Sequence, residues 1–158
     1  MAAKQIVAID ESVLPFEPDA VQRVLGDIGH YGEWWPAPFR FQPADASALP
    51  RVRVHNGFLN WTLSVATVTR EQIVLRYEDG AWAGEGRWTV SRCHEGTRVL
   101  YRIHLAPRSI FARGLSHAVD LQRRHSHDML RVFKGLDERL TSLGVPRLPP
   151  PDAPESPK

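Results

Sequence analysis

His125 is the residue of this sequence best suited to acid–base or hydrogen-bonding chemistry. It lies in the run LQRRHSHDML, three residues after Gln122 and four before Met129. Residues three and four apart share one face of a helix, so these three side chains are expected to face the same way. The imidazole ring titrates near neutral pH and can donate or accept a hydrogen bond. His125 can therefore be a core histidine bonded to a tyrosine or a backbone carbonyl, a contact for a ligand carbonyl or hydroxyl, or a proton-transfer group.

Metal binding and nucleophilic catalysis have little support in the sequence. His125 and His127 are two residues apart and point to opposite sides of a helix. The chain has neither HExxH nor a CxxC pair, and Cys93 is its only cysteine. No GxSxG motif or phosphate-binding loop is present, and the carboxylates Asp10, Glu11 and Glu85 are scattered. We expect no metal and no cofactor. An enzyme of this sequence would have to rely on a shaped pocket with His125 and Tyr101.

Aromatic residues form a second group of candidates. Trp61, Tyr77, Trp88 and Tyr101 lie in phase with apolar neighbours in stretches that alternate like strands. They are expected to face inward and to give a cavity with aromatic walls and hydroxyl tips. Plain core packing is the alternative, and we expect it to account for about half of them. Three arginines that alternate out of phase are expected on the outer face: Arg76, Arg87 and Arg102.

The run HYGEWWP places Trp34 and Trp35 side by side before a proline. Neighbours on a helix point about 100° apart, so a flat surface cannot bury both rings. We predict that Trp35 points into the cavity near its mouth, and that Trp34 packs between the short helices and a long one.

The spacing of apolar residues predicts an α+β domain with an antiparallel sheet. Residues 4–14 read as a first strand, the run from Asp19 as a short helix, and HYGEWWP as one more helical turn. Residues 37–50, rich in proline and alanine, are expected to be loop or irregular edge. Strand patterns follow, separated by turns short enough for hairpins, over 51–58, 59–70, 72–80, 84–93 and 97–107.

From Ile110 to Leu143 the apolar period becomes three and four, which predicts one long amphipathic helix ended by Gly144 and Pro146. A curved sheet of about six or seven strands would wrap around this helix, with two short helices closing one end. Residues 1–144 would form this domain. Residues 145–158 are proline-rich and are expected to be a flexible tail.

Composition fits one globular domain of the cytoplasm. The chain has 158 residues, of which 42% are hydrophobic and 24% charged. It shows no apolar signal core and no run long enough for stable membrane insertion. The formal net charge is only +2, and acidic residues interrupt the basic cluster Arg123–His125. We therefore expect a solvated helix face and no nucleic-acid partner, with a polyanion or membrane-surface site as the alternative.

Three stretches, in this order, carry a likeness to a known superfamily. They are VLPFEPDAVQRVLGDIGHYGEWWP, then GEGRWTV with GTRVLYRIHL, then HSHDMLRVFKGLDERL. They resemble the opening, the last two strands and the final helix of the START-like or birch-pollen-allergen-like helix-grip superfamily (SRPBCC), and within it the bacterial polyketide cyclase/dehydrase-like branch. His125 and Met129 fall where that family often has a histidine and a methionine. The chain departs at Gln22, where the family has a bulky aromatic residue, so the floor of the cavity is expected to be more polar or differently packed.

The resemblance implies a ligand cavity between sheet and final helix, but not one activity, since its members include lipid carriers, ubiquinone binders, hormone receptors and aromatase/cyclases. Three hypotheses follow. The first is a pocket that binds a lipid, quinone or polyketide-like molecule without chemistry, and the second is a polyketide cyclase or dehydratase. The third is an interaction module that uses the basic helix face and the tail. No catalytic residue is assigned, and the ligand-binding candidates are Trp35, Trp61, Tyr77, Trp88, Tyr101, Gln122, His125 and Met129.

Overall fold

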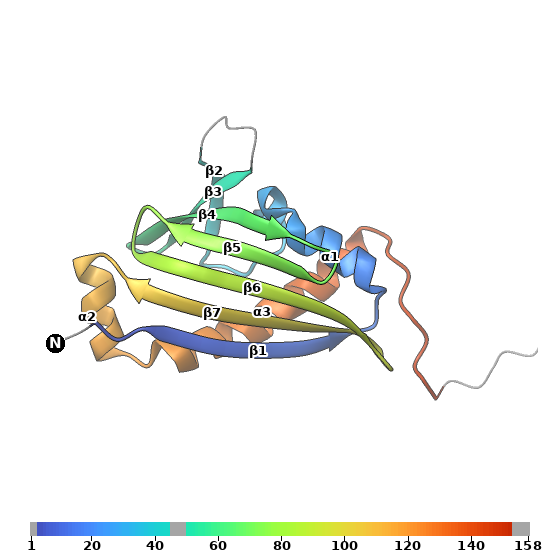
Figure 1. Cartoon of the computed structure of the whole chain (residues 1–158). Helices are drawn as coiled ribbons and strands as arrows, with labels where there is room; N and C mark the ends of the chain where they lie inside the picture. The colour runs from blue at the N-terminus through green and yellow to red at the C-terminus, as the bar shows by residue number, and fades with distance from the viewer. Residues whose placement is uncertain (1–2, 45–49, 153–158) are drawn as a thin grey trace, which may run out of the picture.

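The computed structural model of the chain describes residues 3–44 and 50–152, which fold into an antiparallel sheet and helices that cover one of its faces (Figure 1). The elements, in chain order, are β1 (Ile6–Leu14), α1 (Pro18–Gly26), the 3-10 helix η1 (Ile28–Glu33), β2 (Arg40–Pro43), β3 (Arg51–Asn56), β4 (Leu59–Val68), β5 (Gln72–Glu78), β6 (Trp82–Cys93), β7 (Gly96–Pro107), α2 (Ile110–Ala118) and α3 (Leu121–Ser142).

The sheet is a seven-stranded meander that begins at one edge with the first strand. Its order is β1-β7-β6-β5-β4-β3-β2, and every neighbouring pair is antiparallel. The hairpins predicted between β3 and β7 are present. In the first of them Gly57 takes a positive φ of 60°, a conformation that glycine adopts at little cost.

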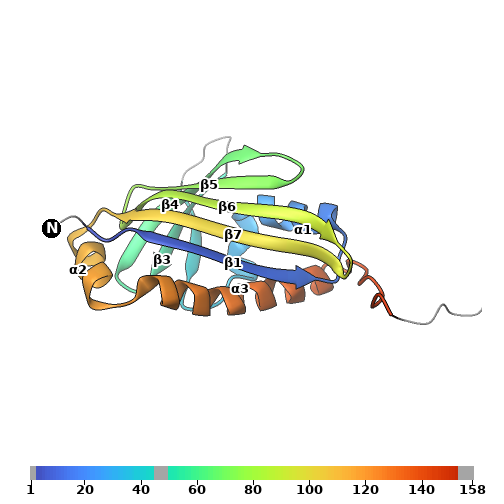
Figure 2. The same ribbon diagram turned by 60° about the horizontal axis from the view of Figure 1, so that its bottom comes forward.

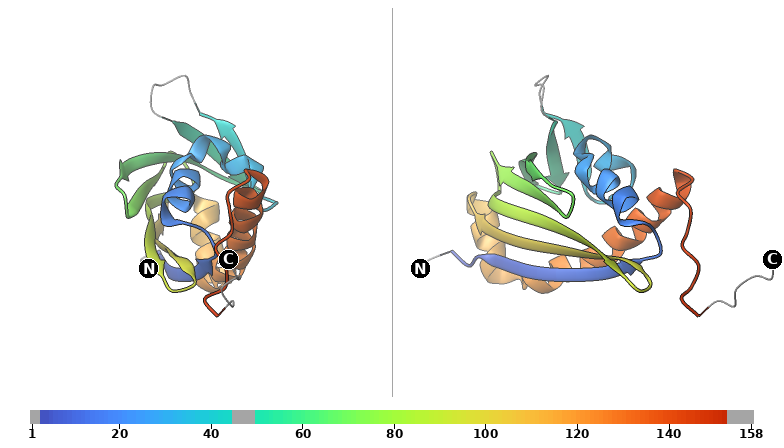
Figure 3. Two further views of the ribbon diagram at one scale, coloured as in Figure 1. Left: turned by 90° about the vertical axis from the view of Figure 1, so that its right-hand side faces the viewer. Right: turned by 45° about the vertical axis from the view of Figure 1, so that its right-hand side comes forward.

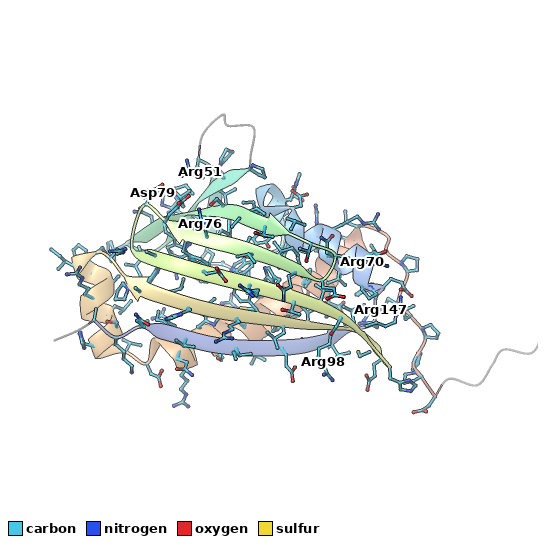
Figure 4. The ribbon with its side chains drawn as sticks, viewed as in Figure 1. Arg51, Arg70, Arg76, Asp79, Arg98 and Arg147 are labelled. Atoms are coloured by element: carbon cyan, nitrogen blue, oxygen red, sulfur yellow. The ribbon has the colours of Figure 1, made fainter. Side chains whose placement is uncertain are left out.

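The sheet curves around α3, which lies across its concave face (Figures 2 and 3). Residues at helical spacing face the sheet and are buried: Met129, Val132, Phe133, Leu136 and Leu140. The short helices α1 and η1 close one end. The predicted helix-grip arrangement is thereby confirmed. On the convex face Arg76 and Arg102 are exposed, as expected, and so is Arg98 (Figure 4).

The predicted single helix over 110–143 is wrong, because the chain breaks it into α2 and α3. Val119 is extended, with φ −133° and ψ 144°, and Asp120 accepts a hydrogen bond from the Arg123 backbone N–H at 3.0 Å. Asp120 therefore caps a new helix. The apolar period continues through the break, which hid it from the sequence pattern. Among the described segments, no helix combines the length and apolar character needed to span a bilayer.

Two further expectations need correction. Within 37–50, expected to be loop or irregular edge, Arg40–Pro43 forms the edge strand β2, paired with β3 on one side only. The start of the expected flexible tail is attached to the domain, since the Leu148 N–H donates to the Pro15 carbonyl at 2.8 Å and Val145 packs on the core. Residues 45–49 and 153–158 lie outside the described parts of the chain.

Candidate ligand-binding cavity

A cavity of about 370 Å³ lies between the inner face of the sheet and the helices. Its walls come from β1, η1, the strands β2 to β7, α2 and α3. Most of the residues that line it are aliphatic or aromatic. Among the described residues, the strongly polar side chains in its wall are those of Asn56, Arg124, His125 and Asp128. The cavity is therefore an apolar space with a few polar groups, three of which lie on the first turns of α3.

Aromatic rings make up one side of the wall. Trp61 of β4 stacks on Tyr77 of β5, with ring centroids 6.1 Å apart and 23° between the planes. Phe39 packs edge-on against Trp61 at 6.5 Å, and Phe41 packs against Trp35 at 5.9 Å. All five residues line the cavity. The strand alternation that placed Trp61 and Tyr77 on the inner face is confirmed.

The two adjacent tryptophans face different ways: Trp35 lines the cavity and Trp34 packs on α3, as predicted, while the position of Trp35 near the mouth stays a prediction. Trp35 stacks on Tyr31 of η1 at 5.3 Å and lines the cavity. Trp34 has 7% of its surface exposed and packs on α3 at Gly135. The Trp34 carbonyl oxygen lies so close to this glycine that a Cβ added to residue 135 would be 2.2 Å from that oxygen. The backbone N–H of both tryptophans bonds to the Tyr31 carbonyl, so the turn is closed and the rings diverge.

Trp88 and Tyr101 belong to the core behind the cavity. Both are fully buried, stack at a centroid distance of 4.2 Å, and are not among the lining residues. Trp88 also contacts Phe133 of α3 edge-on at 6.2 Å. For these two residues the alternative of plain core packing is the one that the geometry favours.

Tyr101 nevertheless reaches the cavity through a second tyrosine. Its hydroxyl lies 2.5 Å from the hydroxyl of Tyr77, and the space for this pair exists because residue 86 is glycine: a Cβ there would be 2.4 Å from the Tyr101 oxygen. Burial raises the pKa of Tyr77 to about 12 and that of Tyr101 well above its ordinary value. Both hydroxyls stay neutral at physiological pH. Since they share one hydrogen bond, one O–H is left to donate elsewhere.

His125 lines the cavity and is paired with a carboxylate from the opposite side of the grip. Its Nδ1 lies 3.2 Å from Oδ2 of Asp10 in β1, and its ring stacks on Tyr101 at 6.0 Å. Burial alone would raise the pKa of Asp10, but hydrogen bonds with His125 and Ser126 and the charge of His125 outweigh burial and lower it. Asp10 is therefore a carboxylate that fixes Nδ1, and Nε2 has no hydrogen-bond partner among the described residues.

Asp10 is the residue that the sequence reasoning missed. In the sequence it stands among scattered carboxylates, although the phase of β1 puts it on the inner face with Ile6, Ala8 and Leu14. A charged residue in the inward phase of a strand was the available signal.

Gln122 was expected to share the inward face with His125, and this is wrong, because it is exposed on the first turn of α3 and does not line the cavity. Met129, one turn beyond His125, is 1% exposed and lines the cavity as expected. The departure at Gln22 does not reach the floor of the cavity, since this side chain donates to the Thr69 carbonyl at 3.0 Å.

The indole N–H groups of Trp35 and Trp61 are buried in the cavity wall, and neither has a hydrogen-bond partner among the described residues. Leaving such a donor unpaired costs about 1–3 kcal/mol. The indole N–H groups of Trp34 and Trp88, which do not line the cavity, are buried without a described partner as well, so these donors are shared by the whole aromatic cluster. In the described parts of the chain, no three histidine, cysteine or acidic side chains are grouped so as to hold a metal ion.

Comparison with known proteins gives structural neighbours only. No family model and no curated protein matches the sequence. The crystal structure of the protein TTHA0849 from Thermus thermophilus matches with a TM-score of 0.64 and 19% identity, covering 89% of this chain and 99% of that one. The Zhui aromatase/cyclase from a Streptomyces species matches with a TM-score of 0.65 and 18% identity, covering 90% and 100%.

A third neighbour is a START superfamily protein from Mycobacterium smegmatis, with a TM-score of 0.64 and 12% identity, covering 88% of this chain and 98% of that one. Identities this low establish the fold and leave the ligand open. The fold, with its long helix held in a curved antiparallel sheet, is that of the START-like helix-grip proteins, aromatase/cyclases among them.

Proposed function

We propose that this protein binds a hydrophobic or aromatic small molecule, of the lipid, quinone or polyketide-like class, in the cavity between the sheet and α3. The observation that carries the proposal is the cavity itself: about 370 Å³ of space walled mainly by aromatic and aliphatic side chains. This volume lies in the range of small-molecule sites, and its apolar wall would repel a strongly charged ligand.

A polar group in the wall narrows the chemical class of the ligand further. Tyr77 lines the cavity and shares one hydrogen bond with Tyr101, which leaves one O–H of this pair to donate. A ring compound that carries a carbonyl oxygen would accept from this O–H and stack on the aromatic wall. A saturated hydrocarbon chain would leave it unpaired, so we favour a quinone or polyketide-like ligand over a simple lipid.

Native mass spectrometry of the freshly purified protein, with organic extraction of bound material, tests this proposal. We expect a stoichiometric apolar adduct that is lost in His125→Trp, whose ring would fill the cavity beside Met129. The matched control is His127→Trp, two residues along α3 on an exposed position, which should keep the adduct. A protein that carries no adduct and also fails to enhance the fluorescence of an apolar naphthylamine dye would refute the proposal.

A second candidate is a polyketide cyclase or dehydratase that uses the same cavity, and the His125–Asp10 pair is the observation that favours it. With Nδ1 bonded to Asp10, Nε2 can take a proton from the carbon between two ligand carbonyls. The resulting enolate carbon attacks a further carbonyl carbon, whose oxygen becomes an alkoxide and takes the proton back from Nε2. In the dehydration Nε2 then removes a second proton from the carbon next to the new hydroxyl and passes it to that hydroxyl, which leaves as water while a C=C bond forms. A structural neighbour described as an aromatase/cyclase is consistent with this candidate.

The two candidates differ in what His125→Ala does to a synthetic poly-β-ketone thioester. A catalytic His125 predicts that turnover disappears while the dissociation constant changes little. Parallel loss of binding and turnover would assign His125 to binding and leave the first proposal standing.

A further inference from the structure

Large apolar side chains are exposed where the cavity reaches the surface. Phe58, in the turn between β3 and β4, is 97% exposed, and Phe111, in the first turn of α2, is 75% exposed. Both belong to the lining of the cavity, so they mark its mouth. Ile110, next to Phe111, is 85% exposed. Single exposed apolar residues are common on protein surfaces, but three around one opening form an apolar rim.

The helix α2 carries large apolar side chains on the side that faces away from the domain. Ala112 and Ser116 point into the domain and are buried. Ile110 and Phe111 are exposed on the outer side, with Gly114, His117 and Ala118 exposed beside them. Figure 2 shows α2 at the end of the molecule where α3 begins, standing beyond the sheet. A surface helix normally needs one apolar side only, so the outer side calls for a partner.

The same segment is basic. Residues 108–128 contain four arginines and two aspartates, Asp120 and Asp128, which leaves an excess of two positive charges. All four are exposed, and none of them forms an ion pair with a described acidic residue. Elsewhere in the chain Arg87 and Arg139 do form such pairs, with Glu85 and Glu33. The four arginines of this segment are Arg108, Arg113, Arg123 and Arg124.

We propose that the mouth surface, defined as Phe58, Ile110 and Phe111 with the arginines of residues 108–127, docks on an anionic lipid surface. Exposed apolar side chains beside unpaired arginines match a bilayer interface, which offers apolar depth and negative charge together. A two-fold contact between copies would bring this surface against itself and set its unpaired arginines against like charges, which opposes self-association. A folded protein partner would need a pocket for each ring, whereas a lipid surface receives them in any position.

Docking in this way would set the mouth of the cavity against the apolar phase, so that a water-insoluble ligand could pass between bilayer and cavity without crossing water. This docking rests on the cavity proposed above, and it would serve any apolar ligand, whether the protein only binds the ligand or also converts it.

Co-sedimentation of the full chain with vesicles tests this. We expect binding to vesicles of phosphatidylglycerol mixed with phosphatidylcholine, weaker binding to phosphatidylcholine alone, and a loss of affinity when salt is raised. The double variant Phe58→Ser/Phe111→Ser should bind about tenfold more weakly or worse. Arg108→Gln/Arg113→Gln, which leaves the cavity wall intact, should lose about tenfold in affinity as well.

Matched controls replace residues of the same kind far from the mouth. Val68→Ser removes an apolar side chain that is 51% exposed, and Arg76→Gln/Arg98→Gln removes two exposed arginines of the convex face. Both should bind like the unchanged protein. No binding to either vesicle, equal loss in the controls, or a dimer in sedimentation that Phe58→Ser/Phe111→Ser abolishes would overturn the proposal. Binding of the naphthylamine dye in solution is scored separately, so that failure of the cavity and failure of the docking surface are distinguished.

Discussion

An ionised carboxylate on the inner face of a sheet is costly unless a partner compensates it. Asp10 is 14% exposed in its side chain and has two hydrogen-bond partners on α3, His125 and Ser126. The pair also joins the edge strand β1 to α3 from inside the grip. Asp10 therefore contributes both to the orientation of His125 and to the stability of the fold.

Asp10→Asn should lower the free energy of unfolding by about 1–2 kcal/mol at neutral pH, because the amide cannot replace a charged hydrogen bond fully. The effect has a defined pH window. The folded-state pKa of Asp10 lies below its ordinary value of 3.8, so the stability that the carboxylate supplies is complete above 3.8 and is lost as pH falls through the folded-state pKa. Urea unfolding at a series of pH values measures the difference between the two proteins.

The control for this experiment is Glu11→Gln, the next residue of β1, which is exposed on the outer face and should change stability by less than about 0.5 kcal/mol. An Asp10→Asn deficit that stays constant or grows in acid would contradict the role given to the carboxylate.

For single residues, the sequence predicted which way a side chain faces better than whether it ends in the cavity or in the core. The alternation of strands placed Trp61, Tyr77, Trp88 and Tyr101 on the inner face correctly. Only Trp61 and Tyr77 reach the cavity, because Trp88 and Tyr101 lie beneath Phe133 and His125 of α3. An inward side chain ends in the cavity or in the core according to the residues that lie opposite it. These residues are distant in the sequence, so a local pattern does not reveal them.

Among the elements, the junction of η1 with α3 decides how closely the short helices approach the long one. The Trp34 carbonyl lies against Gly135, and the Trp34 ring contacts this position as well. A glycine in the middle of a helix costs about 0.5–1 kcal/mol relative to alanine. Close approach of η1 offsets that cost and places Trp35 in the wall of the cavity.

Gly135→Ala should therefore destabilise the protein by about 1–3 kcal/mol, since the new Cβ would lie 2.2 Å from the Trp34 oxygen and η1 would have to move. Chemical unfolding followed by tryptophan fluorescence measures this. Gly114→Ala in α2 is the control, because a Cβ at that position would meet nothing within 4 Å. This substitution should leave the free energy of unfolding unchanged or raise it by up to about 1 kcal/mol. If both substitutions stabilise, the contact between η1 and α3 is not a constraint.

The order and pairing of elements were largely predictable, because hairpin turns and alternating apolar residues are local signals. The break between α2 and α3 and the strand β2 were not. The first interrupts the chain at Val119 without interrupting the apolar period. The second is a four-residue edge strand whose identity depends on its partner β3. Both features border the cavity, so its shape could not be predicted from the sequence.

For the molecule as a whole, the C-terminal segment ties the end of α3 to the junction of β1 and α1. After α3 the chain turns back, and Leu148 bonds to Pro15 at the junction of β1 and α1. The Arg147 guanidinium donates to Asp137 of α3 at 2.8 Å and lies 5.1 Å from the centroid of the Phe16 ring. Phe16 is fully buried, so this segment covers the core at the end opposite to the cavity mouth.

Two truncations test whether this segment belongs to the domain. Ending the chain after Gly144 should lower the free energy of unfolding by about 1–3 kcal/mol, because it removes the Leu148 hydrogen bond and the apolar contacts of Val145. Ending it after Leu148 keeps those contacts and should leave stability unchanged. Urea unfolding measures both, and dye binding should survive in each, since neither removes a residue that lines the cavity. Equal stability of the two truncated chains would mean that the domain ends at Gly144, whereas loss of dye binding in either would show that the cavity depends on a closed ring of elements.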